Sequence, residues 1–79
     1  MTPETRKRLA KEFGRYAIRH RAKLGLSIQA LHDKMKRLGY QKPPHTRNMQ
    51  KHEAGDMVPS KTKIAMYEEA FGSPFKATS

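Results

Sequence analysis

The chain has 79 residues, with 17 Lys and Arg against 7 Asp and Glu, so its formal net charge at pH 7 is +10. A chain of this length forms one small domain, without room for an enclosed substrate pocket beside a separate core. It has no cysteine, which excludes a disulfide framework and a thiolate zinc finger. The positive charge predicts a polyanionic partner such as nucleic acid, although solubility or non-specific adhesion to polyanions would also account for it.

A long first helix is predicted over residues 3–24, with Thr2 as its cap, Pro3 at its first position and Gly25 at its end. Its apolar residues recur near helical spacing, at Leu9, Phe13, Ala17 and Leu24. The aromatic rings of Tyr16 and His20 lie beside this stripe. The rest of this helix is basic: Arg6, Lys7, Arg8, Lys11, Arg15, Arg19 and Lys23. Alone, such a helix also fits a membrane surface or calmodulin, but the elements that follow favour a globular domain.

A second helix is predicted from its cap Ser27 to Gly39. Its inward positions are expected to be Ile28, Leu31, Met35 and Leu38. A loop follows at residues 40–45, because Pro43 and Pro44 are incompatible with a helix interior.

The third predicted helix, residues 46–54, is short and nearly free of core side chains. Met49 and His52, three residues apart, mark its inner side. The side chains left for solvent are Thr46, Arg47, Asn48, Gln50 and Lys51. They suit hydrogen bonding to base edges, and Arg and Lys also suit phosphate. The alternative is an ordinary solvated surface helix.

Ser60 caps a fourth predicted helix, which Gly72 and Pro74 end. Its inward residues are expected to be Ile64, Tyr67, Ala70 and Phe71. The sequence therefore predicts an all-α fold, a small bundle of about four to five helices.

Four segments, in this order, resemble the phage repressor and Cro family of helix-turn-helix proteins, the xenobiotic-response-element type. They are Phe13-Gly14, Leu26-Ser27, Glu53-Ala54-Gly55 and Pro59-Ser60. The resemblance covers about residues 13–72 and implies a lambda-repressor-like fold. We expect residues 1–72 to form the DNA-binding domain and residues 73–79 a short tail.

The chain departs from this family at two kinds of position. The segment between the second and third helices, residues 36–45, is longer than the family's tight turn, so we expect an extended turn there. Histidine stands where the family usually has apolar residues, at His20, His32 and His52. The resemblance thus places three histidines at inward positions.

The resemblance also implies where DNA would be bound. Thr46, Arg47 and Lys51 are expected to reach base edges, with Gln50 and Asn48 on the same helix, and Arg47 is the first candidate because Arg pairs with guanine. The alternative for Arg47 is a phosphate contact alone. Phosphate contacts are expected from four residues, namely Ser27, Gln29, Lys42 and Lys61.

Two further expectations concern the loop and one pair of charges. Tyr40, Lys42 and His45 would lie at the groove edge, unless the loop is a tolerated insertion that points to solvent. The family resemblance implies that Arg21 bonds Glu53 and so orients the third helix.

We expect no enzyme, because no catalytic triad, zinc-protease or phosphate-loop motif is present. We expect no cofactor or metal either, since histidines are more commonly packed or hydrogen-bonded than metal-bound.

The sequence predicts a sequence-specific double-stranded DNA-binding protein, a repressor or autoregulator of a phage or mobile element that occludes its promoter. We expect a homodimer on DNA, no membrane or small-molecule ligand, and a place in the bacterial cytoplasm or nucleoid. The alternatives are a sequence-indifferent or architectural nucleic-acid binder, and the DNA-binding, antitoxin-like partner of another protein.

Overall fold

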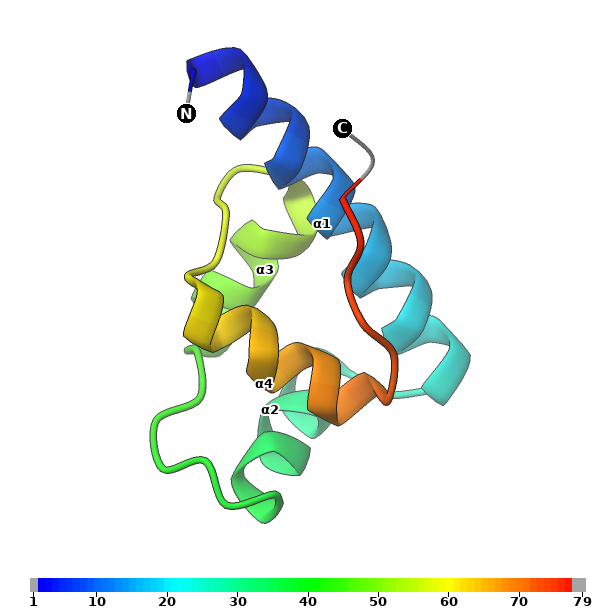
Figure 1. Ribbon diagram of the computed structural model, residues 1–79. Coiled ribbons are helices and arrows are strands. Elements are labelled where there is room, and N and C mark those ends of the chain that lie inside the picture. Colours follow the sequence, from blue (N-terminus) through cyan, green and yellow to red (C-terminus); the bar gives the residue numbers. More distant parts are fainter. Residues whose placement is uncertain (1, 78–79) are drawn as a thin grey trace.

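The computed structural model describes residues 2–77, and helix α1 (Pro3–Leu24) runs along one side of it (Figure 1). Its 22 residues correspond to about 33 Å of helix, close to the longest extent of the molecule, 35 Å. The other three helices are α2 (Ile28–Arg37), α3 (Thr46–Ala54) and α4 (Lys61–Phe71). The described residues contain no strand, so the predicted all-helical fold is confirmed, with four helices.

Hydroxyl side chains start three of these helices, as the sequence predicts. Thr2, Ser27 and Ser60 each accept a hydrogen bond from a backbone amide three residues further along. Each bond satisfies one of the amides that the first turn of a helix leaves without a partner. The helix boundaries are therefore encoded locally, and α2 ends one residue earlier than expected, at Arg37.

One core joins all four helices. Helix α1 packs against α3 and α4, and α2 packs against the same two helices. The buried residues that form the core are Phe13, Tyr16, Ala17, Leu31, Met35, Met49, Met66, Tyr67, Ala70 and Phe71. Since α3 contributes little more than Met49 and His52, its position is set by what it rests on rather than by a hydrophobic stripe of its own.

Gly14 allows α1 and α3 to approach closely. A Cβ atom at residue 14 would lie 2.6 Å from the carbonyl oxygen of Glu53 and 3.1 Å from that of His52. No side chain fits at such distances, and the neighbouring atoms are backbone, which cannot move aside cheaply. The glycine thus fixes the spacing between the last turn of α3 and the middle of α1.

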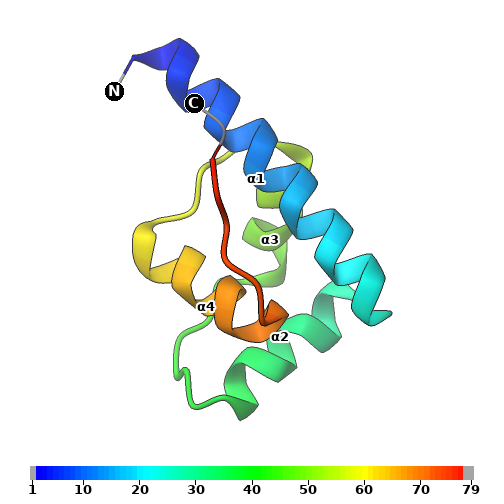
Figure 2. The same ribbon diagram turned by 45° about the vertical axis from the view of Figure 1, so that its right-hand side comes forward.

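The segment after α4 belongs to the core rather than to a free tail. It turns back beside α1 in both views (Figures 1 and 2). The Tyr16 hydroxyl donates to the carbonyl oxygen of Ser73 at 2.7 Å. The Phe75 ring lies 5.1 Å, centroid to centroid, from both Phe13 and Tyr16. The predicted division at residue 72 therefore cuts through packed side chains, although residues 78–79 of the predicted tail lie outside the described part.

Two residues predicted to face inward are instead exposed. Leu24 is 43% exposed and Leu38 42% exposed. Both lie at the end of a helix, where the chain turns at Gly25 and Gly39. Leu26 and Tyr40, each two residues further on, pack against the core in their place.

Replacing Gly14 with alanine should destabilise the fold. Alanine is normally the better helix former by about 1 kcal/mol, yet here its methyl group would overlap the Glu53 carbonyl. We expect a loss of about 1–3 kcal/mol in the free energy of unfolding, measured by urea denaturation. Arg15→Ala is the matched control, because Arg15 is exposed on the same helix and its truncation should change little. A Gly14→Ala protein as stable as the wild type would show that α3 can move away without cost.

Candidate nucleic-acid interface

Helix α3 presents its inner side to the core and its basic side to solvent. Met49 is fully buried and His52 is 3% exposed. Arg47, Gln50 and Lys51 are exposed, as the sequence predicts. Thr46 and Asn48 are half-buried, so the expectation that both are left for solvent is wrong. They lie at the two edges of the exposed surface because they are two residues, or about 200°, apart on the helix.

The first turn of α3 differs from that of the other helices. His45 precedes it in extended conformation, and its side chain makes no capping hydrogen bond. The amides of the first turn therefore keep their capacity to bind an outside acceptor. A shallow depression lined by His45, Thr46, Arg47 and Asn48 lies at this end of the helix. The exposed Arg47 and the half-buried Asn48 thus lie beside a helix end that carries partial positive charge.

The residues predicted to contact phosphate are near the surface, but not all of them are free. Ser27 and Lys61 are exposed at the beginnings of α2 and α4, and the Lys42 side chain is exposed in the loop. The Gln29 amide donates to the Asp33 carboxylate at 3.0 Å, one turn along α2. That local bond uses one of the two N–H donors that Gln29 would offer to a phosphate.

Arg21 and Glu53 form the ion pair that the family resemblance implies. Arg21 Nε lies 2.7 Å from Glu53 Oε2, and Nη2 lies 2.9 Å from Oε1, so the contact is bidentate. The third donor, Nη1, reaches the carbonyl oxygen of Leu26 at 2.9 Å. Hydrogen bonding to Glu53 raises the pKa of Arg21 above its usual value. One guanidinium thus joins α1, the start of the α2 segment and the end of α3.

His52 replaces an expected apolar residue with a hydrogen bond inside the core. Its Nδ1 lies 2.9 Å from the Tyr67 hydroxyl oxygen of α4. Burial, and then the charge of Lys63, lower the pKa of His52. Burial also raises the pKa of Tyr67 above its usual value. Both rings are therefore neutral at neutral pH, and α3 is bonded to α4 without a buried charge.

The other two histidines that stand at usually apolar positions of the resembled family, His20 and His32, are only half-buried. The His20 ring stacks on Phe71, with ring centroids 5.5 Å apart. His32 Nδ1 lies 2.9 Å from the Pro44 carbonyl oxygen, which links α2 to the loop. No group of three His, Asp or Glu side chains within residues 2–77 is arranged to hold a metal ion.

The extended loop between α2 and α3, residues 38–45, is anchored to the body of the protein. Pro43 and Pro44 are buried, and Tyr40 is half-buried and packs on the core. Hydrogen bonding to Glu69 raises the pKa of the Tyr40 hydroxyl. The alternative of an insertion pointing to solvent therefore fails for Tyr40, Pro43 and Pro44, whereas the other residues of the loop are exposed. Lys42 and His45 remain exposed, whereas Tyr40 is committed to packing.

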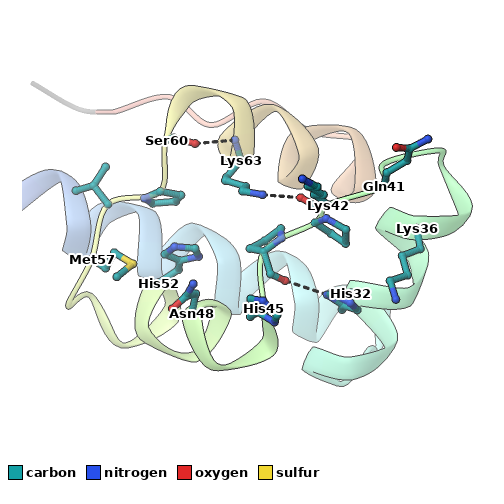
Figure 3. A pocket seen from close by; sticks show the side chains of 14 residues that line it. His32, Lys36, Gln41, Lys42, His45, Asn48, His52, Met57, Ser60 and Lys63 are labelled. Atoms are coloured by element: carbon teal, nitrogen blue, oxygen red, sulfur yellow. Dashed lines mark hydrogen bonds between the residues drawn. The ribbon is translucent and has the colours of Figure 1, made fainter.

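A cleft of about 750 Å³ lies between this loop, α3 and the start of α4 (Figure 3). Sequence reasoning did not find it, because it depends on how the loop folds back. Its wall includes Lys36, Lys63 and His52, for none of which a binding role was predicted. The only feature of the sequence that pointed to this cleft was the unusual length of the segment that carries Pro43 and Pro44.

No protein-family model, curated protein or solved structure matches the chain. The family resemblance of the four segments therefore has no support beyond the residues that carry it. Within the described residues, no helix combines the length and apolar character needed to cross a bilayer.

Breaking the Arg21–Glu53 pair should cost stability. The side chains are 26% and 8% exposed, so we expect each single change to alanine to cost about 2–3 kcal/mol, between the values for exposed and buried pairs. A double-mutant cycle measured by urea denaturation separates the pair from the bond between Arg21 and Leu26. A coupling free energy near zero would mean that the two side chains do not stabilise each other.

His52 should make the stability of the fold depend on pH. Its folded pKa lies below the unfolded value, which is about 6.5, so between these two values the unfolded chain binds the extra proton. The contribution of neutral His52 is therefore complete above the unfolded pKa and decreases as pH falls toward the folded pKa.

We expect the free energy of unfolding to fall between about pH 7.5 and pH 5, and to fall less in His52→Leu. The leucine variant loses the Tyr67 bond at every pH, so the quantity to compare is the slope of the free energy of unfolding against pH. His45→Asn, which removes an exposed histidine, is the control and should keep the wild-type slope. Equal slopes in all three proteins would contradict this assignment.

Proposed function

We propose that the protein binds double-stranded DNA sequence-specifically, with α3 in the major groove. The observation that carries the proposal is the two-sided character of α3, buried at Met49 and His52 and basic at its exposed surface. Helix α3 contributes little to the core, so its presence at the surface is best explained by a binding role of its exposed side chains. Arg, Lys, Gln and Asn are the side chains that read base edges.

The supports of α3 fit this proposal. A reading helix must be held rigidly, since base discrimination depends on well-aligned hydrogen bonds. Helix α3 is held by the Arg21–Glu53 pair, by the bond between His52 and Tyr67, and by close approach at Gly14. None of these contacts uses the exposed side of the helix.

The proposal includes a lambda-repressor-like helix-turn-helix with an extended turn, and four helices in a small bundle are compatible with it. In this proposal α2 and α3 form the motif, with residues 38–45 as the turn. Arg47 is the leading base reader, accompanied by Thr46, Gln50 and Lys51, while Ser27 and Lys61 contact phosphate. Asn48 is assigned to the edge of the interface, because it is half-buried and lines the cleft.

The simplest biological consequence is repression by promoter occlusion, including autoregulation. One helix of nine residues reads too few base pairs to define a unique genomic site, so two copies would bind a two-fold-related site.

Sequence-indifferent binding is a second candidate, and the charge on α1 favours it. Seven cationic side chains are exposed along α1: Arg6, Lys7, Arg8, Lys11, Arg15, Arg19 and Lys23. They occupy several sides of that helix, and a protein that only coats nucleic acid would use charge of this kind. Competition by unrelated DNA at physiological salt separates the two candidates.

Changing Arg47 should alter sequence preference. On a site selected from random duplexes, we expect Arg47→Ala to lose about 1–3 kcal/mol of discrimination at one base pair. Arg47→Lys keeps the charge but not the fork of donors, so it should lose much of the same discrimination while retaining the salt dependence. An unchanged ranking of single-base variants in both proteins would mean that Arg47 touches phosphate only.

Lys61→Ala is the comparison for a phosphate contact. It should weaken binding to all sequences alike and reduce the slope of log affinity against log salt by about one. A base-specific effect of Lys61→Ala, or an unchanged slope, would contradict its assignment.

A further inference from the structure

The wall of the cleft between the loop, α3 and α4 combines positive and neutral polar groups with five apolar residues, Pro43, Pro44, Met57, Val58 and Pro59. Three lysines and three histidines contribute to its wall: Lys36, Lys42, Lys63, His32, His45 and His52. No Asp or Glu lines it. Its volume of about 750 Å³ lies within the usual range for small-ligand sites, about 300–1,000 Å³. The charge of the wall favours an anionic occupant.

The cleft is held open by bonds within the protein. Lys63 Nζ donates to the Lys42 carbonyl oxygen, and His32 Nδ1 donates to the Pro44 carbonyl oxygen, as Figure 3 shows. The second bond needs the Nδ1 proton, because a carbonyl can only accept. The Lys63 ammonium has two further donors, which keep their capacity for an oxygen in the cleft. Little ordering is therefore required when a ligand binds.

His52 places one more donor on the cleft wall. The Tyr67 hydroxyl is fully buried, and the partner recorded for it among the described residues is His52 Nδ1. Donation by the hydroxyl requires Nδ1 to accept, so the proton of the neutral ring is on Nε2. No hydrogen bond is recorded for Nε2, and no wholly buried side-chain nitrogen or oxygen in the described residues lacks a partner. Because the ring lines the cleft, the Nε2–H is the donor that His52 can offer to an occupant.

We propose that this cleft binds a phosphate group, with Lys63 as the main counter-charge and His52 Nε2 as a neutral hydrogen-bond donor. Lys42 and Lys36, which are exposed, supply further positive charge on the wall of the cleft. The proposal goes beyond DNA reading by α3, because it uses the loop, α4 and the inner side of α3 and does not require the exposed side of α3 to lie in a groove. The phosphate has two possible sources, the DNA backbone and a small phosphorylated molecule.

The first arm of the test uses inorganic phosphate as the probe. We expect amide resonances around the cleft to shift in a nuclear magnetic resonance titration at constant ionic strength. Lys63→Gln should weaken this binding about tenfold, the usual effect of losing a charged hydrogen bond. Lys76→Gln is the matched control, since it removes the same charge from an exposed lysine after α4, outside the cleft, and should leave the affinity unchanged.

His52 is tested by a pair of variants. His52→Leu removes the donor and should weaken phosphate binding, whereas His52→Gln keeps an amide N–H and should retain part of it. Equal effects of Lys63→Gln and Lys76→Gln, or shifts spread evenly over the basic surface, would overturn the proposal. These lysine variants keep the test decisive even where a His52 variant fails to fold.

The second arm uses a fluorescent duplex and identifies the source. If the phosphate belongs to DNA, inorganic phosphate competes with the duplex and Lys63→Gln lowers the salt slope by about 0.9. If it belongs to a small molecule, phosphate and duplex bind together and the slope is unchanged. If the duplex binds but inorganic phosphate does not, only the proposal of a phosphate site in the cleft is refuted. If phosphate binds but the duplex does not, only the proposed DNA-binding function is refuted.

Discussion

The ion pair between Arg21 and Glu53 is the contact on which the position of α3 depends. Helix α3 has too little apolar surface to hold itself against the core, since its deeply buried side chains are Met49 and His52. Hydrophobic burial alone would leave its direction loosely defined, because that effect is not directional. Two parallel charge-assisted hydrogen bonds supply the direction. The close approach at Gly14 supplies the distance.

The core accommodates polar groups because each one has a partner. The hydroxyl of Tyr16 reaches Ser73, and that of Tyr67 reaches His52. Burial, and then the charge of Glu68, raise the pKa of Tyr16 to about 12, so its hydroxyl stays protonated and can donate. Paired polar groups define one arrangement of the helices, where an entirely apolar contact would tolerate several. In this small domain, polar contacts and apolar packing thus specify the same structure.

Local signals were sufficient to predict the helices, and most of the core could be predicted from helical spacing. Thr2, Ser27 and Ser60 mark starts through their own hydroxyls, which depend on nothing distant in the chain. Helix ends were harder, because Leu24 and Leu38 continue an apolar pattern past the point where any element covers them. Phe75 was missed because one aromatic residue after a helix has no periodicity to reveal it.

The candidate site also has features that could be predicted from the sequence and features that could not. Exposure of Arg47, Gln50 and Lys51 follows from the spacing of α3, and the partner of Arg21 came from the family resemblance. The cleft could not be predicted, since its wall combines α2, the loop, α3 and α4, and its shape depends on buried Pro43 and Pro44. Composition and order along the chain carry no information about which way such a loop folds.

The packing of Phe75 against Phe13 and Tyr16 has a consequence for the order of events during synthesis. Translation delivers α1 first, but its aromatic side chains lack these partners until a residue some sixty positions later has been added. The aromatic cluster around Phe13 and Tyr16 is therefore complete only when residue 75 has left the ribosome, although all four helices have been translated by residue 71. Until then the nascent chain exposes aromatic surface, and it is in this interval that a chaperone or a protease would encounter it.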